Sequence, residues 1–390
     1  MNAIESDCLV MPRGGPRPRR AGARRPLPQC WGRGGRALGA LIGVVVVATM
    51  APAQALAQFP TETADPTPTL SSPTAVPLSV IAPGASVERL ATGFQFTEGP
   101  AADANGDVFF SDVRASRIHR WSVSGGALTT HREGAVGTNG LYFDGRGRLV
   151  VCESGARRVV REEADGTITV LADAFDGKRL NSPNDVWIHP AGHIYFTDPR
   201  YGSTADIEQD GMHVYLLPAD GGPIRRVTGD LRQPNGVIGT PDGRIVYITD
   251  PGAGANRTWR YRVDSDGSLV DQSEYVPVGG DGMAIDEAGN VYLATGGRVR
   301  VFAPGGAPLA DIAVSESPTN VAFGGADFRT LFITARTGFY AVRMAVRGAD
   351  GPFAWGSPSP EPSATASATP MPLPVPAPRL YLPWSVRQGG

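Results

Sequence analysis

The sequence predicts an all-β protein, a six-bladed β-propeller with four antiparallel strands in each blade. One pattern recurs six times between residues 84 and 350: a polar residue, a short apolar strand, a tight turn and a second strand. The glycines of the first five turns are 41, 45, 51 and 46 residues apart, which is the period of a propeller blade. The chain also holds 50 Gly and 35 Pro among 390 residues, and this richness in turns argues against a helical bundle.

Each copy reaches its turn eight residues after its polar residue. The copies, from the polar residue to the end of the second strand, are 98–112, 139–153, 184–198, 235–250, 281–295 and 320–334. A third and a fourth strand follow within a copy, as at 213–217 and 224–227. Four short strands repeated radially form a propeller. A β-sandwich would not explain six copies of one motif.

The last copy lacks a fourth strand after residues 338–344. Residues 87–90 precede the first copy and can supply the missing strand. We therefore expect this N-terminal strand to complete the sixth blade and close the ring.

The polar residues that begin the copies should form a ring. Equivalent positions in radially repeated blades lie on one circle, here at the mouth of the central channel. The six residues are Glu98, Asn139, Asn184, Asn235, Asp281 and Asn320. Carboxylate and amide oxygens suit a hard cation, and the absence of thiol or imidazole favours Ca²⁺ over zinc or copper. The alternative is that Asn and Asp before Gly mark turns, but Glu98 has no turn preference and Asn320 precedes Val321.

The N-terminus has the pattern of an export signal. Residues 13–36 carry eight Arg and no acidic residue, and the apolar run 37–50 follows. Ala55 and Ala57 supply the small residues that signal peptidase needs, so we expect residues 1–57 to be removed and the protein to be secreted, periplasmic or at the cell surface. An uncleaved anchor is the alternative, although the run is shorter than the roughly 20 residues of a span. The choice between the Sec and twin-arginine routes is open.

The chain flanking the propeller is predicted to be linker. Residues 58–83 and 351–378 are rich in Pro, Ser and Thr, a composition that cannot bury enough apolar surface to fold. The last segment, 379–390, is apolar again. It suggests an element that docks to the cell surface, with an adventitious apolar end as the alternative.

Charge and cysteine content exclude some functions. Without residues 1–57 the chain has 28 basic and 36 acidic residues, a net charge of −8, so no basic surface for nucleic acid is predicted, and no membrane span is expected in the mature chain. Cys152 is then the only cysteine, which excludes an internal disulfide. It lies in an apolar strand, where we expect an inert, buried thiol.

Several motifs resemble the SMP-30/gluconolactonase/regucalcin-like family of six-bladed propellers, which is related to calcium-dependent lactonases and to diisopropyl-fluorophosphatase. The resemblance covers about residues 84–345. It rests together on residues 96–100, 182–186, 196–202, 233–236, 281–285 and 318–325.

The resemblance implies a metal site and an activity. In that family the polar residues of blades one, three, four and five bind one divalent cation, which corresponds here to Glu98, Asn184, Asn235 and Asp281. Ca²⁺ is the expected ion, with Zn²⁺ and Mn²⁺ left open. Asp281 resembles the catalytic aspartate, acting as general base or as nucleophile. Asn139, Asn320 and Ser182 would line the substrate pocket.

One position departs from the family. Animal members have an Arg two residues before the blade-three asparagine, and this chain has Ser182 there, which puts sugar-lactone specificity in question. The expected function is metal-dependent hydrolysis of a small-molecule lactone or related ester. The alternative is a non-catalytic, secreted or surface propeller that binds a ligand or partner protein at the same mouth.

Overall fold

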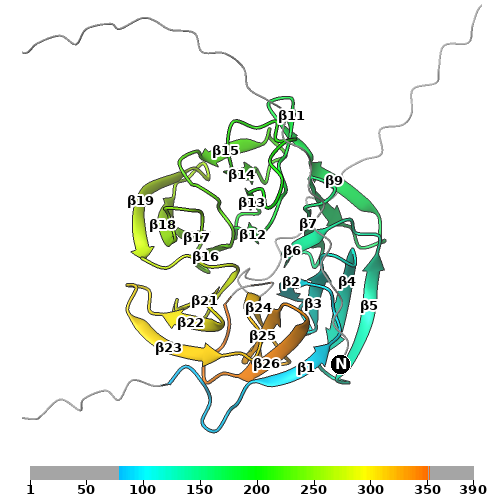
Figure 1. The fold of residues 1–390 in the computed structure, drawn as a ribbon, viewed down its shortest axis with the longest axis vertical. Coiled ribbons are helices and arrows are strands. Elements are labelled where there is room, and N and C mark those ends of the chain that lie inside the picture. The colour runs from blue at the N-terminus through cyan, green and yellow to red at the C-terminus, as the bar shows by residue number, and fades with distance from the viewer. Residues whose placement is uncertain (1–78, 350, 352–390) are drawn as a thin grey trace, which may run out of the picture. The chain divides into compact units, whose positions relative to one another are not determined.

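The computed structural model describes residues 79–349 and 351, and these residues form a six-bladed β-propeller without helices (Figure 1). The fold predicted from the repeat is confirmed.

Blade 1 consists of β2 (Thr97–Ala102), β3 (Val108–Asp112), β4 (Arg117–Ser122) and β5 (Ala127–Glu133), and blade 2 of β6 (Thr138–Phe143), β7 (Leu149–Glu153), β8 (Arg158–Glu162) and β9 (Ile168–Ala172). Blade 3 consists of β12 (Val186–Ile188), β13 (Ile194–Asp198), β14 (His213–Leu217) and β15 (Arg225–Thr228), and blade 4 of β16 (Val237–Gly239), β17 (Ile245–Asp250), β18 (Arg257–Val263) and β19 (Leu269–Val276). Blade 5 consists of β20 (Met283–Ile285), β21 (Val291–Thr295), β22 (Arg298–Phe302) and β23 (Pro308–Ala313).

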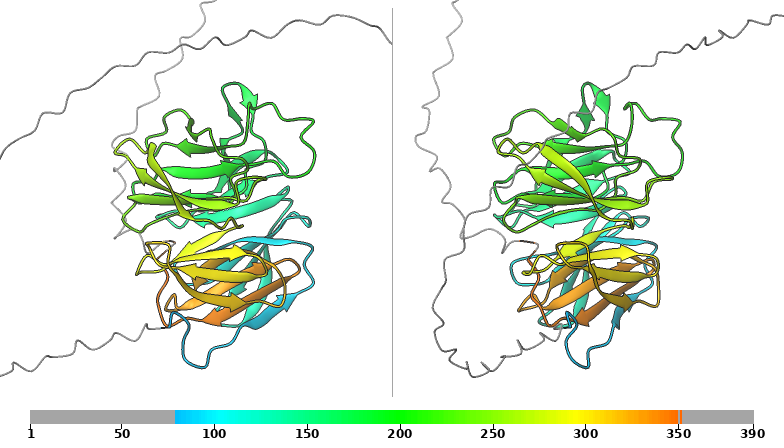
Figure 2. Two further views of the ribbon diagram at one scale, coloured as in Figure 1. Left: turned by 60° about the vertical axis from the view of Figure 1, so that its left-hand side comes forward. Right: turned by 90° about the vertical axis from the view of Figure 1, so that its left-hand side faces the viewer.

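Blade 6 joins the two ends of the propeller. It consists of β24 (Pro318–Gly324), β25 (Thr330–Ala335), β26 (Gly338–Arg343) and the N-terminal strand β1 (Glu88–Thr92). β1 pairs antiparallel with β26, from Glu88 opposite Ala341 to Thr92 opposite Gly338. The ring is therefore closed by the strand that the sequence predicted. A short hairpin, β10 (Ala174–Phe175) with β11 (Lys178–Arg179), lies at the outer edge between blades 2 and 3 (Figures 1 and 2).

Burial decreases outward along each blade. Every residue of the innermost strand β2 is buried, whereas nearly every residue of the outer strand β5 is exposed. The apolar core lies between neighbouring blades, where aromatic rings pack face to face or edge to face. Phe109 meets Phe143 between blades 1 and 2 with ring centroids 5.1 Å apart, and Phe110 stacks on Phe339 between blades 1 and 6 at 4.2 Å. This packing fixes the blades around the axis and so determines where the innermost strands begin.

The turns between the first and second strands lie at the end of the ring away from the polar residues. Each turn closes with the same backbone hydrogen bond, for example from the amide of Gly106 to the carbonyl of Asp103 at 2.9 Å. The residue at this position has a left-handed backbone, which favours glycine. In blade 6 Phe328 takes the place of the glycine and adopts the same conformation, with φ of 55°, and its amide makes the same bond to the carbonyl of Gly325 at 3.0 Å.

The chain after β26 crosses this far end and reaches the channel. The amide of Ala349 donates to the carbonyl of Ile285 at 2.9 Å, and the amide of Gly351 donates to the hydroxyl of Tyr142 in blade 2, also at 2.9 Å. Near the other end of the described chain, Val80 is buried and its carbonyl accepts a hydrogen bond from Ala345 at 2.9 Å. Residues before the predicted boundary at 84 therefore contact blade 6.

The predicted signal peptide (1–57) and C-terminal tail (379–390) lie outside the described residues, as do most of the two predicted linkers. Among the residues that are described, none belongs to a helix long and apolar enough to cross a membrane.

Candidate active site

The polar residues come together because the innermost strands approach one another closely at their first residues. In four blades a glycine follows the polar residue and lies against the polar residue of the next blade: Gly99, Gly140, Gly236 and Gly282. A Cβ on Gly140 would lie 2.6 Å from the carbonyl oxygen of Asn184, well inside van der Waals contact. The recurring Asn-Gly and Asp-Gly pairs thus have a packing reason, and the alternative that they only mark turns does not explain them.

Glu98 of blade 1 and Asp281 of blade 5 lie on either side of blade 6, near enough for the charge of Asp281 to affect Glu98. Glu98 is 4% exposed, while Asp281 keeps partial solvent access. Burial, together with the negative charges of Asp281 and Asp185, holds the pKa of Glu98 well above its usual range. The protein around Asp281 likewise raises its pKa, mainly by desolvation. The negative charges of these two carboxyl groups repel one another, and a bound cation would stabilise both in their ionised form.

Asn235 and Tyr201 extend this cluster in blade 4 and blade 3. The Nδ2 of Asn235 donates to Oδ1 of Asp281 and to the hydroxyl of Tyr201, each at 2.7 Å. Asn320 of blade 6 lies near Glu98, where it works against the rise in the pKa of Glu98, and its Oδ1 accepts from the amide of Val321 at 2.8 Å. Hydrogen bonds therefore link Tyr201, Asn235 and Asp281, and Glu98 and Asn320 lie beside this cluster.

The remaining predicted residues occupy the same rim. Asn139 and Asn184 are buried at the starts of the innermost strands of blades 2 and 3, and the amide of Gly140 links them by donating to the carbonyl of Asn184 at 2.7 Å. Ser182 is half-buried, and its Oγ donates to the carbonyl of Ser154 at 3.3 Å. At the position where the resemblance would put an arginine, Ser182 thus joins two loops.

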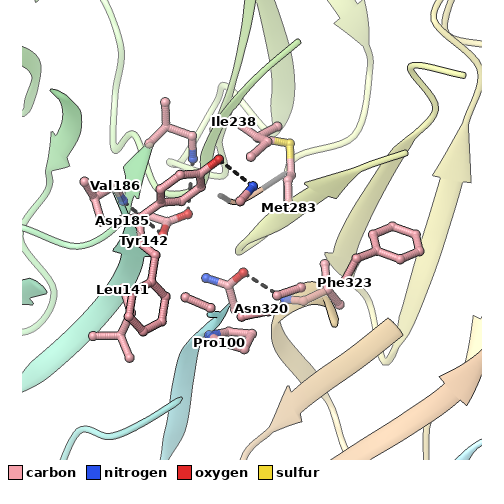
Figure 3. A pocket seen from close by; sticks show the side chains of 16 residues that line it. Pro100, Leu141, Tyr142, Asp185, Val186, Ile238, Met283, Asn320 and Phe323 are labelled. Atoms are coloured by element: carbon pink, nitrogen blue, oxygen red, sulfur yellow. Dashed lines mark hydrogen bonds between the residues drawn. The ribbon is translucent and has the colours of Figure 1, made fainter. Parts of the chain in front are cut away.

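Asp185 lies directly beneath the ring and lines a small cavity in the channel (Figure 3). Its carboxylate accepts hydrogen bonds from the amides of Val186 at 3.0 Å and Val237 at 3.2 Å, and burial raises its pKa to about 7. The cavity has a volume of about 30 Å³, enough for one or two water molecules. Figure 3 shows Asp185 and Asn320 pointing into it among mainly apolar side chains. The channel is packed below the ring, so a substrate must enter from the mouth.

Three aspartates stabilise the loops that precede the polar site residues. Asp112, Asp198 and Asp250 end the second strands of blades 1, 3 and 4, and each carboxylate accepts two consecutive backbone amides from the loop before the polar residue of its own blade. Asp198, for example, accepts from Asn181 at 2.7 Å and from Ser182 at 2.6 Å. Sequence reasoning missed this function, although the signal was present in the recurring Ser/Thr-Asp pair.

Hydroxyl groups of the same pair link one blade to the next. Thr197 donates to the carbonyl of Asn235 at 2.6 Å, and Ser111 donates to the carbonyl of Asn139 at 2.7 Å. Cys152 occupies the corresponding position in blade 2 and is completely buried, and burial raises the pKa of its thiol well above its usual value. The thiol therefore has the inert environment that the sequence predicted.

The donor set of the ring fits a hard divalent cation. Glu98 and Asp281 offer two carboxylates, and Asn184 and Asn235 offer amide oxygens, which are ligands that Ca²⁺ accepts. Within the described residues there is no group of three or more His, Cys, Asp or Glu side chains arranged as a metal site.

Known proteins share both the sequence and the fold. A family model described as the SMP-30/Gluconolactonase/LRE-like region matches residues 96–337. The chain belongs to this family. A gluconolactonase from Zymomonas mobilis is 30% identical over 294 residues, which cover 67% of this chain and 82% of the relative.

Solved structures of relatives agree with this membership. A gluconolactonase from Xanthomonas campestris is 32% identical with a TM-score of 0.64, and the match covers 68% of this chain and 91% of that protein. Regucalcin from Agrobacterium tumefaciens, described as a calcium-binding protein, matches with a TM-score of 0.58 at 21% identity over 68% of this chain and 95% of its own. At that identity the likeness shows the fold alone. The family resemblance drawn from the motifs is thereby confirmed.

Proposed function

We propose that this member of the SMP-30/Gluconolactonase/LRE-like family is a lactonase, a hydrolase that opens a lactone or a similar ester with the help of one divalent cation at the mouth of the channel. The observation that carries the proposal is the pairing of two carboxyl groups, Glu98 and Asp281, near enough for the charge of Asp281 to raise the pKa of Glu98, with Asn235 hydrogen-bonded to Asp281. The gluconolactonases from Zymomonas and Xanthomonas among its relatives support the substrate class.

Glu98, Asn184, Asn235 and Asp281 would hold the cation, with Ca²⁺ as the expected ion. A bound cation of this kind supplies charge that polarises a lactone carbonyl and acidifies nearby water. The oxygen-only donor set supports calcium. Zn²⁺ and Mn²⁺ are the alternatives that a metal titration has to separate.

Asp281 acts as the general base and then returns the proton. Its carboxylate accepts a proton from the water that attacks the carbonyl carbon, the ring C–O bond then breaks, and the proton returns to the departing oxygen to give a hydroxy acid. Its partial solvent access lets water and substrate reach it, and the bond from Asn235 fixes the orientation of its Oδ1. Direct attack by the carboxylate is the alternative, in which the ring C–O bond breaks as Asp281 forms an anhydride with the acyl carbon. Single-turnover hydrolysis in ¹⁸O-water reveals this route when water cleaves the anhydride at the aspartyl carbon, because the first product then carries an unlabelled oxygen from Asp281.

The test is a panel of sugar, acyl-homoserine and aromatic lactones, assayed with chelator and with Ca²⁺, Zn²⁺ or Mn²⁺ added back. We expect turnover of at least one lactone that chelator abolishes and one of these ions restores. A complete lack of turnover, with calcium still raising the melting temperature, would favour the non-catalytic binding propeller.

A further inference from the structure

The mouth of the ring carries an aromatic side chain that neither the predicted ligand set nor the proton transfer uses. Tyr201 lies in the segment that joins β13 to β14, and its side chain is 48% exposed. Tyr201 is the one exposed tyrosine among the described residues, whereas Tyr195, Tyr215 and Tyr247 are completely or almost completely buried. Its exposure therefore contrasts with the packing use of tyrosine in the rest of the propeller.

The backbone beside Tyr201 is fixed to the loops on both sides of it. The carbonyl of Arg200 accepts a hydrogen bond from Nε2 of Gln233 at 2.9 Å, two residues before Asn235. The guanidinium of Arg200 donates through Nη1 to the carbonyl of Asn181 at 3.0 Å, three residues before Asn184. It also pairs with Asp206 further along the same segment. The backbone next to Tyr201 is thus bonded to the two loops that lead to the candidate ligands Asn184 and Asn235.

The hydroxyl of Tyr201 lies beside the proposed proton acceptor, while about half of the residue is exposed to solvent. Its oxygen accepts from Asn235 at 2.7 Å, and that same amide contacts Asp281. A tyrosine hydroxyl that accepts one hydrogen bond keeps its own O–H to donate. Ser182, at the position where the resemblance would put an arginine, directs its hydroxyl to Ser154. The mouth therefore has in Tyr201 a donor for a substrate hydroxyl.

We infer that Tyr201 is a specificity-determining residue whose O–H donates to a hydroxyl group of the lactone, with its exposed ring against the C–H face of the substrate. The inference rests on the proposed lactonase function and narrows the substrate class to polyhydroxylated, sugar-type lactones. A fixed aromatic with a polar tip suits such a ligand because one side of a sugar ring is apolar and its edge is polar.

The test compares Tyr201→Phe with the parent on two lactones, D-glucono-1,5-lactone and δ-valerolactone, which has no hydroxyl group. We expect kcat/KM for the sugar lactone to fall about tenfold, as for the loss of one hydrogen bond, and that for valerolactone to change less than about twofold. Tyr261→Phe is the matched control, because the hydroxyl of Tyr261 also accepts from a side-chain amide, that of Gln272 at 2.9 Å, but lies in β18.

Calcium affinity, measured by titration calorimetry, is the second readout. We expect Tyr201→Phe to keep it, since Asn235 retains its bond to Asp281. A large loss of calcium affinity would overturn the inference, because Tyr201 would then act through Asn235. Equal changes on both lactones, or none on either, would overturn it as well.

Binding of gluconate, the stable hydrolysis product, separates this inference from the proposed function. If the parent protein hydrolyses no lactone but binds gluconate, and Tyr201→Phe weakens that binding, the lactonase proposal fails and the contact at Tyr201 stands. The absence of both turnover and gluconate binding overturns both.

Discussion

The amide of Asn235 donates to Oδ1 of Asp281 at 2.7 Å, so the polar residues of blades 4 and 5 are in direct contact through their side chains. The contact fixes the orientation of the residue that we propose as the proton acceptor. It also separates two effects of mutation at Asp281, because an amide at this position still offers an oxygen to Asn235 but no negative charge.

Asp281→Asn should abolish most turnover and leave the fold intact. Loss of a general base lowers kcat by about 10²- to 10⁴-fold, while the retained side-chain oxygen keeps the bond to Asn235 and part of the metal affinity. Steady-state kinetics and calcium calorimetry measure the two effects. Asp311→Asn is the control, since Asp311 is an exposed acid on the outer strand of the same blade. Full activity of Asp281→Asn would exclude Asp281 as base and as nucleophile.

Calcium should stabilise the protein more as the pH rises toward neutrality. Burial raises the pKa of Asp185 to about 7 and that of Glu98 well above its usual range, whereas carboxyl groups in the unfolded chain titrate near about 4. Without metal, the folded protein therefore binds more protons than the unfolded chain, and its stability falls as the pH rises from about 4 to about 7. Above that range protons no longer compete with the cation.

The measurement is the melting temperature with calcium and with chelator across this pH range. At about one hundred times Kd, calcium should add about 2.7 kcal/mol to the free energy of unfolding near pH 7.5 and less at pH 5.5. Glu98→Gln should reduce the calcium effect at each pH. A calcium effect independent of pH, or one unchanged in Glu98→Gln, would place the cation elsewhere.

Gly140→Ala should destabilise the ring and disturb Asn184. A methyl group there would press on the backbone of Asn184 and Asp185, and overpacking of this kind typically removes about 1–3 kcal/mol of stability. For a domain of this size we expect a melting temperature several degrees lower, at about 2–4 °C per kcal/mol, together with weaker calcium binding. Gly305→Ala is the control, because a Cβ there meets no atom within 4 Å. Equal melting temperatures for the two variants would contradict the close-approach explanation.

Residues 79–351 should fold as a unit and keep the activity of the full chain. Deletion from residue 79 through Thr92 should instead remove cooperative unfolding, because it removes β1, the strand that closes blade 6. Thermal unfolding followed by circular dichroism distinguishes the two fragments. A cooperative transition in the shorter fragment would mean that the ring does not need β1.

The export signal stays a prediction from sequence. We expect mass spectrometry of the native protein to find its N-terminus near Gln58, in a fraction outside the cytoplasm, because residues 13–57 hold a basic region, an apolar region and a small-residue cleavage site. Retention of residues 20–50 in the isolated protein would contradict cleavage and favour a membrane anchor.

The sequence predicted those features that repeat with the blades. The turn residue eight positions after each polar residue, a glycine in five of the six copies, set the register, and the register was sufficient to place Glu98, Asn235, Asp281 and Asn320 on one circle. The same reasoning recovered the closing strand, because one blade lacked a fourth strand.

What the sequence did not reveal depends on contacts between segments far apart in the chain. The position of Tyr201 is set by Gln233 and Asn181, residues of two other loops, and no local pattern specifies those bonds. The role of Asp198 was missed for another reason. The sequence shows an aspartate at the same position in three blades, as Asp112, Asp198 and Asp250, but only the structure shows that Asp198 binds the backbone amides before Asn184.

The described chain begins and ends at the far side of the ring from the candidate site. Ile81 pairs with Met344 there, and Gly351 lines the small cavity in the channel. A fragment of residues 79–351 that carries an affinity tag, a fusion partner or a surface linker directly at either end would thus have its attachment point away from the substrate entrance. Immobilising this fragment through either end should orient the entrance away from the support, which makes the propeller suited to assays on a solid surface.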